Sequence, residues 1–459
     1  MRVPGWAVIA SALALAAMDR RVLSAAAVDG RVRSFVKEKR EQVNKVAAER
    51  KIKMPAEVGK MFDAAARGQW RTATNLFEGI KKKHKPPDDF GNTNAWPGEL
   101  WFPIQEVGAL GDLAEEPGLW FFAEEVFRAV PRGSVYFGGT DPGRFMITAL
   151  STSHADGNPF FTITQNQLVA RDYLKYVQSM YGSRLSVPAL ELIQRAFSNY
   201  LSDVQGRLKH DTEFPGEPKQ LKPGEQVSVV DGRVQVSGNV AVMAINGAIA
   251  KAIFDQNSGR EFYVEESFEL EWMMPHFTPA GPIMKLNRRP PETLPDDMIL
   301  RDREYWKGIA QRFIGWAADD GASLEEVCRV AEELHGKAPR KNFKGDREYL
   351  RSPMSANTWG RLRSTGGAVY ALHEKNAGSA SERRRMGREA QLAFKQAYTL
   401  SPKNPETVWR YTMYLLNTPE PQQARTLVQS ALKLDPENKR TEETAKYVEG
   451  YIRWSQGNR

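Results

Sequence analysis

A set of residues that recurs at a spacing of 34 is the feature that most constrains the fold of this chain. The recurring positions hold small residues, large apolar residues, a proline and an asparagine. They are Ala390, Phe394, Ala397, Leu400, Pro402 and Asn404, and then Ala424, Val428, Ala431, Leu434, Pro436 and Asn438. Small residues let paired helices approach closely, large apolar residues fill the space between them, and proline ends the second helix of each pair. The pattern predicts a stack of helix pairs.

This pattern resembles the tetratricopeptide repeat family over about residues 356–450, because 34 residues is the period of that family's helix–turn–helix unit. The second unit departs from the family at Thr412, where a smaller residue is usual, and the first carries extra residues, 377–385, between its helices. Only two units are clear, fewer than the three or so that an isolated stack needs. We therefore expect the helices at 299–335 to pack against the stack and residues 441–452 to close it. The resemblance implies a protein or peptide partner.

A glycine-rich turn follows a short strand pattern in the middle of the chain. Alternation over residues 134–137 predicts a strand with one well-buried face, and residues 145–150 read as a helix. Glycines in the turn between them let the backbone take positive φ and approach a ligand closely, and the amides of a helix start favour an anion. The predicted ligand-binding residues are Gly138, Gly139, Thr140, Asp141, Arg144, Gln165 and Asn166. They would form an α/β-type site on the edge of a sheet.

Two interpretations of this turn stay open. In one, polar side chains converge at strand ends, where open α/β sheets place their ligands. Those side chains are Asp141, His154, Gln165, Asn166 and Glu266. In the other, Asp141 only caps a turn and Gln165-Asn166 only satisfy turn backbone.

A second resemblance is to the soluble C-terminal half of bacterial membrane proteins of the O-mannosyltransferase-like kind. It rests on the sequence Gly-Gly-Thr-Asp-Pro-Gly-Arg-Phe at 138–145, the strand pattern at 160–164, Tyr173-Leu174 and the repeats that follow. That family has a comparable turn after a strand. The resemblance implies a shared extracytoplasmic module. It argues against transferase activity in this chain, because the family's glycosyl transfer would occur in a membrane half that has no counterpart in this sequence.

Changes in composition divide the chain into four segments, 1–27, 28–88, 96–290 and 297–459. The second is helical, rich in Lys, Arg and Glu, and contains what looks like half of another repeat unit. In the third, strands alternate with helices of ten or more residues, which predicts a partly parallel sheet with helices on both faces. A hairpin is expected there at Asp231-Gly232, which lies between two valine alternations. The fold class expected is an α/β central domain followed by α-helical repeats, helix-rich overall.

The first segment has the pattern of an export signal. Arg2 precedes an apolar run from Trp6 to Met18, and Ala25-Ala26-Ala27 supplies a small-residue cleavage site. The run is short for a membrane span, and no other segment is apolar for long enough. We therefore expect a periplasmic or secreted mature protein that does not span a membrane. Because Asp19-Arg20-Arg21 interrupts the pattern, a buried or amphipathic first helix in a cytoplasmic protein is the alternative.

Composition and charge exclude some classes of partner. The hydrophobic share of 41% and the charged share of 26% are those of a soluble globular protein. The net charge of +8 is spread out, and its two runs, Lys81–Lys83 and Arg383–Arg385, are not interleaved with aromatic residues. No nucleic-acid partner is therefore expected. The single cysteine, Cys328, precludes an intrachain disulfide and lies on an apolar helical face, which predicts a core thiol.

The sequence contains no motif of a known catalytic class. There is no phosphate-binding loop, dinucleotide fingerprint or nucleophile elbow. The six histidines lack metal-ligand spacing, so we expect no metal and no cofactor. Glu265 and Glu266 adjoin on a strand pattern and would point to opposite faces, which makes them a poor acid/base pair. An exported protein-interaction or scaffolding protein, rather than an enzyme, is the function expected. The alternative is an enzyme or lectin-like domain that binds a sugar or phosphate-bearing ligand at the Gly138–Arg144 turn.

Overall fold

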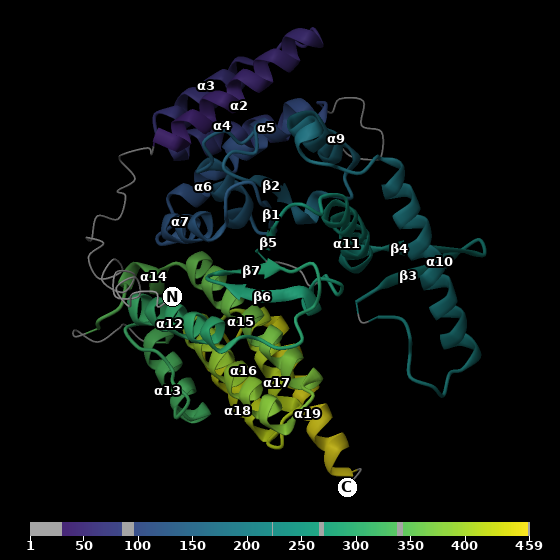
Figure 1. Ribbon diagram of the computed structural model, residues 1–459, viewed down its shortest axis with the longest axis vertical. Helices are drawn as coiled ribbons and strands as arrows, with labels where there is room; N and C mark the ends of the chain where they lie inside the picture. The colour runs from purple at the N-terminus through teal and green to yellow at the C-terminus, as the bar shows by residue number, and fades with distance from the viewer. Residues whose placement is uncertain (1–29, 85–95, 223, 266–269, 337–342, 458–459) are drawn as a thin grey trace, which may run out of the picture.

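The computed structural model of the chain describes residues 30–84, 96–222, 224–265, 270–336 and 343–457. Figure 1 shows three regions along the long axis of the molecule. Short helices lie at one end, a small sheet with its helices lies in the middle, and a stack of long helices lies at the other end. The expected export signal and Glu266 fall outside the described residues.

The N-terminal helical unit consists of α2 (Gly30–Glu49), α3 (Ala56–Ala66) and α4 (Trp70–Lys83). The last two form a helical hairpin, and Gly68 permits its tight turn by taking a φ of 72°. Helix α4 buries one face only, and the residues of that face are Trp70, Ala73, Phe77 and Ile80. The spacing of these residues is that of an amphipathic helix, and the helical character predicted for this segment is therefore confirmed.

Helices and strands alternate in the central region. Its helices are α5 (Gly98–Gly108), α6 (Leu110–Ala114), α7 (Leu119–Ala129), α8 (Ile147–Ala149), α9 (Arg171–Tyr181), α10 (Glu191–Glu213) and α11 (Gly238–Gln256). Its short helical turns are η1 (Pro142–Met146), η2 (Gln165–Gln167), η3 (Gly182–Arg184) and η4 (Met274–His276). Its strands are β1 (Val135–Gly138), β2 (Phe161–Thr164), β3 (Gln226–Val230), β4 (Arg233–Ser237), β5 (Phe262–Val264), β6 (Phe277–Ala280) and β7 (Ile283–Leu286).

The central sheet is mixed, with strand order β2-β1-β5-β7-β6. Strand β1 runs parallel to β2 and β5, and the β5–β7 and β7–β6 pairs are antiparallel. All residues of β1 and β2 are buried, so both faces of the sheet are covered there. The expectation of one buried face for β1 was therefore wrong, because this strand is interior to the sheet and helices pack on both of its sides. The partly parallel character is confirmed.

The hairpin expected at Asp231-Gly232 is present. Strands β3 and β4 pair across these two residues, whose φ angles are 50° and 73°. Two consecutive positive φ angles are what the preferred two-residue hairpin turn requires. Together with α10, the hairpin projects from the side of the molecule (Figure 1).

Beyond the sheet the chain is helical, as predicted. The helices are α12 (Asp296–Ile314), α13 (Leu324–His335), α14 (Arg347–Arg351), α15 (Pro353–Asn376), α16 (Ala380–Leu400), α17 (Pro405–Leu416), α18 (Gln422–Leu434) and α19 (Lys439–Gly457). Helix α13 packs against α16 and α18, and α19 packs against α17 and α18, as expected. The extra residues at 377–385 mostly lengthen α16, whose first turn is capped by Ser379, rather than forming a loop.

The six predicted repeat-packing residues all lie buried in the second helix of a pair. They are Ala390, Phe394 and Ala397 in α16, and Ala424, Val428 and Ala431 in α18. The apolar interior forms two clusters. One runs from α2 through the sheet to α15, so that the N-terminal unit and the central region share a core, and the other lies within the stack.

We expect replacement of Ala397 or Ala431 by leucine to lower the free energy of unfolding by about 1–3 kcal/mol. Both alanines are buried, at 0% and 1% exposure, so a larger side chain must displace the neighbouring helix. Urea denaturation of each variant measures the effect. The control is Ala380→Leu, which places the same side chain on the exposed beginning of α16 and should change stability by no more than about 0.5 kcal/mol. Equal values for buried and exposed variants would contradict the assigned helix contacts.

Candidate functional site

The glycine-rich turn after β1 surrounds the carboxylate of Glu265. This residue directly follows β5, which is the parallel neighbour of β1, so the two strands end at the same edge of the sheet. The backbone N–H groups of Gly139 and Thr140 each donate a hydrogen bond to Glu265 Oε2, at 3.0 Å. The Thr140 hydroxyl donates to Oε1 at 2.5 Å. The turn is thus an anion-binding site, and the anion is a side chain of the same protein.

A fourth donor reaches this carboxylate from the helical stack. Arg361, on α15, donates from Nη2 to Glu265 Oε1 at 2.5 Å. Glu265 is fully buried and Arg361 is largely buried, so solvent does not screen the pair. Ion pairs of this kind hold their geometry when hydrogen bonds satisfy the remaining oxygen lone pairs, as the turn does here. The Glu265 junction, which we define as Gly139, Thr140, Glu265 and Arg361, therefore joins the sheet to the stack.

Glycine is required in the turn because other groups come very close to it. A Cβ atom on Gly143 would lie 1.7 Å from Glu265 Oε2, and one on Gly138 would lie 2.5 Å from the Gly143 carbonyl oxygen. The Tyr136 hydroxyl also donates to this carbonyl, at 2.8 Å. Neither Gly138, Gly139 nor Gly143 has a positive φ. The close contacts of the turn are therefore with groups of the protein itself, and the expected approach to a ligand stays a prediction. The expected positive φ was wrong.

The other predicted ligand residues lie around the same turn. Asn166 donates from Nδ2 to the Gly139 carbonyl at 3.0 Å, and Gln165 beside it is buried. Asp141 and Arg144 pair with each other, with Arg144 Nε at 3.0 Å from Asp141 Oδ1. The structure thus brings these residues together at one end of β1 and β2. His154 lies elsewhere, beside Glu106.

Glu265 and Arg361 are the residues of this site that sequence reasoning missed. One signal was available for Glu265, because it follows a strand and parallel strands end at the same edge as the glycine turn. The sequence analysis considered Glu265 only as one half of an acid/base pair with Glu266, and so did not consider it as a hydrogen-bond acceptor for the turn. Arg361 carries no local signal, since 96 positions separate it from Glu265.

A second cluster of buried polar groups lies between α2, α5 and α9. Lys39 Nζ is 2.7 Å from Glu106 Oε2 and donates to the Tyr176 hydroxyl, also at 2.7 Å. That hydroxyl donates to the same Glu106 oxygen at 3.1 Å. His154 Nδ1 is 3.6 Å from it. The buried cluster, defined as Lys39, Glu106, His154 and Tyr176, therefore holds one lysine charge against one carboxylate charge.

Burial and the neighbouring Lys39 ammonium hold the pKa of His154 well below its usual range, and burial lowers the pKa of His335 to about 4. Both histidines therefore bind a proton less readily in the native protein than in the unfolded chain, in which a histidine titrates near pH 6.5. The stability that comes from keeping these two histidines neutral is fully present above about pH 6.5 and is lost as the pH falls below that value. We expect the free energy of unfolding to decrease between pH 7 and pH 5, by up to about 1.4 kcal/mol per pH unit for each histidine.

Urea denaturation at several pH values measures this dependence. The His154→Phe and His335→Gln variants should each show a smaller slope than the unaltered protein, because each lacks one proton-binding group of the unfolded state. Slopes that do not change in either variant would mean that other groups control the acid sensitivity.

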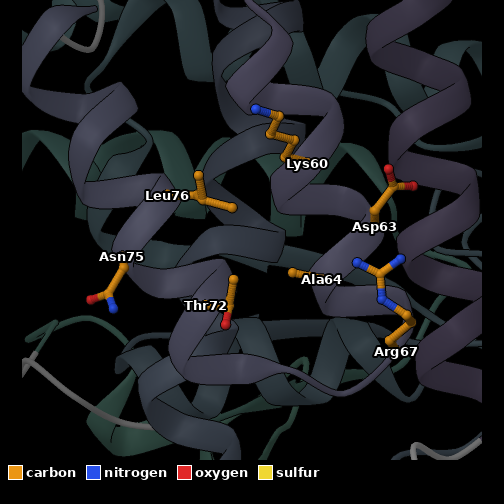
Figure 2. A pocket seen from close by; sticks show the side chains of 7 residues that line it. All are labelled: Lys60, Asp63, Ala64, Arg67, Thr72, Asn75 and Leu76. Carbon is orange, nitrogen blue, oxygen red and sulfur yellow. The ribbon is translucent and has the colours of Figure 1, made fainter.

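An open cavity of about 540 Å³ lies between α3 and α4. Lys60 and Asp63 line it from α3, Arg67 from the end of that helix, and Thr72 and Asn75 from α4 (Figure 2). The methyl groups of Ala64 and Leu76 complete the lining. The cavity is thus bounded by charged groups on one helix and neutral polar groups on the other.

The helical stack exposes aromatic side chains on two neighbouring helices. Trp409 of α17 and Tyr447 of α19 are 38% and 46% exposed, and their ring centroids are 5.5 Å apart. Trp454, two turns further along α19, is 63% exposed, and its ring lies 5.9 Å from that of Tyr451. We call Trp409, Tyr447 and Trp454 the aromatic face. Large exposed apolar groups that gather in this way are typical of interaction surfaces.

Comparison with protein-family models, curated proteins and solved structures finds no match for this chain.

In the described part of the chain, no helix combines the length and apolar character that crossing a bilayer requires. The same residues contain no group of three or more His, Cys, Asp or Glu side chains placed to hold a metal ion. Cys328 is buried, as predicted for a core thiol.

Proposed function

We propose that this protein is an exported protein-interaction scaffold, and that the aromatic face of its helical stack binds a protein or peptide partner. The observation that carries the proposal is the exposed contact between Trp409 and Tyr447. Tryptophan and tyrosine are the residues that most often dominate binding energy at protein interfaces. Both side chains come from helices that pack on each other, so the face is held by a rigid scaffold.

The glycine-rich turn supports a sugar or phosphate ligand less well than the stack supports a protein partner. Its amide donors at Gly139 and Thr140 already bind Glu265, and Asp141 pairs with Arg144. An external ligand would have to displace a fully buried carboxylate that accepts four hydrogen bonds. We therefore propose that the turn serves the internal structure and that binding takes place on the stack.

Chemical crosslinking and affinity capture from extracts of the native host test this function. The bait is the full chain, compared with a Trp409→Ala/Tyr447→Ala variant and with a control variant, Phe197→Ala/Phe214→Ala. The control removes two exposed aromatic rings from and next to α10. We expect at least one captured protein to be depleted about tenfold or more by the first variant and retained by the control, consistent with roughly 1.4 kcal/mol or more of binding energy.

Both variants should fold, since each of the four rings is more than a third exposed and none belongs to either apolar cluster. Thermal melting checks this before capture. Identical sets of captured proteins for the unaltered chain and for the Trp409/Tyr447 variant would refute binding through the aromatic face.

A further inference from the structure

The positive charge of this protein is concentrated in the N-terminal helical unit. Residues 30–84 hold 15 Lys and Arg against 6 Asp and Glu, a net charge of +9, whereas the whole chain carries +8. The sequence-based view that the charge is spread out is therefore wrong when the charge is counted by structural region. A region with such an excess attracts negatively charged partners and accelerates their encounter.

Within this unit, two of these cations, Lys60 and Arg67, line the same side of the cavity between α3 and α4. Lys60 lies on α3 and Arg67 is the C-cap residue that follows it, so the two are seven positions apart, which corresponds to about 10 Å along a helix axis. Neither forms an ion pair with any other residue that the structure describes. The carboxylate between them, Asp63, is already bound by Arg40, whose Nη1 lies 2.6 Å from Asp63 Oδ1. The cavity therefore carries an uncompensated positive charge.

The opposite wall and the base of the cavity suit a peptide. Thr72 and Asn75 offer a hydroxyl and a carboxamide, which can donate to or accept from peptide groups. Ala64 and Leu76 offer apolar surface, against which the methylene groups of a glutamate side chain can pack. A volume of about 540 Å³ is large enough for several side chains.

We propose that the α3–α4 cavity binds an acidic peptide segment of a protein partner, with Lys60 and Arg67 each contacting a carboxylate. Their separation fits two acidic side chains that lie a few residues apart on an extended segment, because such a segment advances about 3.3 Å per residue. The lining contains no aromatic side chain on which a base could stack, which disfavours a nucleic acid. This surface is distinct from the aromatic face, which belongs to the opposite end of the molecule (Figure 1).

Fluorescence anisotropy of a labelled hexaglutamate peptide with the full chain tests the proposal. The test variant is Lys60→Glu/Arg67→Glu. The matched control is Arg33→Glu/Lys45→Glu, which makes the same change in net charge at two exposed positions of α2 that do not line the cavity. We expect the test variant to bind the peptide at least tenfold more weakly and the control to bind it less than threefold more weakly.

Circular dichroism establishes that each variant is folded. If the charge reversal disturbs folding, the Lys60→Gln/Arg67→Gln variant is used in its place, and it should also bind the peptide more weakly than the unaltered chain. Equal weakening by test and control variants would overturn the site, because it would mean diffuse attraction to the whole basic unit. Tighter, Lys60- and Arg67-dependent binding of a six-nucleotide oligothymidylate would overturn the proposal in favour of a nucleic acid. Displacement of the peptide by inorganic phosphate at equal concentration would overturn it in favour of a free anion.

Discussion

Replacement of Glu265 by alanine should lower the free energy of unfolding by about 3–5 kcal/mol, the usual cost of removing one partner of a buried ion pair. The variant would leave the Arg361 guanidinium largely buried without this carboxylate. It would also leave the N–H groups of Gly139 and Thr140 without their acceptor. Because Glu265 holds the sheet and the stack together, a single substitution should weaken both regions. Urea denaturation monitored by circular dichroism measures the loss.

The control for this experiment is Glu261→Ala. Glu261 is also a glutamate in an ion pair, with Lys285, and lies four residues before Glu265, but half of its side chain is exposed. Exposed pairs contribute about 0–1 kcal/mol. If Glu265→Ala costs no more than this control, the Glu265 junction does not hold the two regions together.

The buried cluster should show a large loss that a second substitution reverses. Lys39→Met removes the ammonium that lies 2.7 Å from Glu106 and leaves that carboxylate buried beside the Tyr176 hydroxyl and His154. We expect a loss of about 3–5 kcal/mol. Adding Glu106→Leu removes the unpaired charge, so the double variant should recover most of the loss, since apolar replacement of a whole buried pair is often neutral or stabilising.

Urea denaturation of the two single variants and the double variant forms a thermodynamic cycle that isolates the Lys39–Glu106 coupling. Lys37→Met serves as the control, because Lys37 is on the same helix and is largely exposed. This substitution should change the free energy of unfolding by no more than about 0.5 kcal/mol. Additive effects of the two single changes would contradict a direct coupling between the lysine and the carboxylate.

Features encoded by local patterns were predicted well. The helices of the stack, the hairpin at Asp231-Gly232 and the strand before Gly138 each depend on residues that are close together in the sequence. Strands β6 and β7 were not predicted. Pro279 lies inside β6, and proline argues against a central strand because it cannot donate to the ladder. Its presence is compatible with the sheet only because β6 is the edge strand.

The candidate site was predicted only in part, for a physical reason. The sequence indicates that the glycine turn can bind an anion, since that property belongs to the turn itself. It does not indicate which anion, because Glu265 and Arg361 reach the turn only after the sheet has formed and the stack has packed on it. The buried cluster is a similar case, since 137 positions separate Lys39 from Tyr176.

The contact between Gly143 and Glu265 also has an evolutionary consequence. Because Gly143 has no side chain, the carboxylate of Glu265 can lie where the Cβ atom of any other residue would be. A mutation that adds even a methyl group at position 143 is therefore tolerated only in a background in which residue 265 has already become shorter. Such a change at residue 265 removes the carboxylate that accepts a hydrogen bond from Arg361. Positions 143, 265 and 361, which lie in distant parts of the sequence, should therefore change together among descendants of this protein. The change at position 265 should come before the change at position 143.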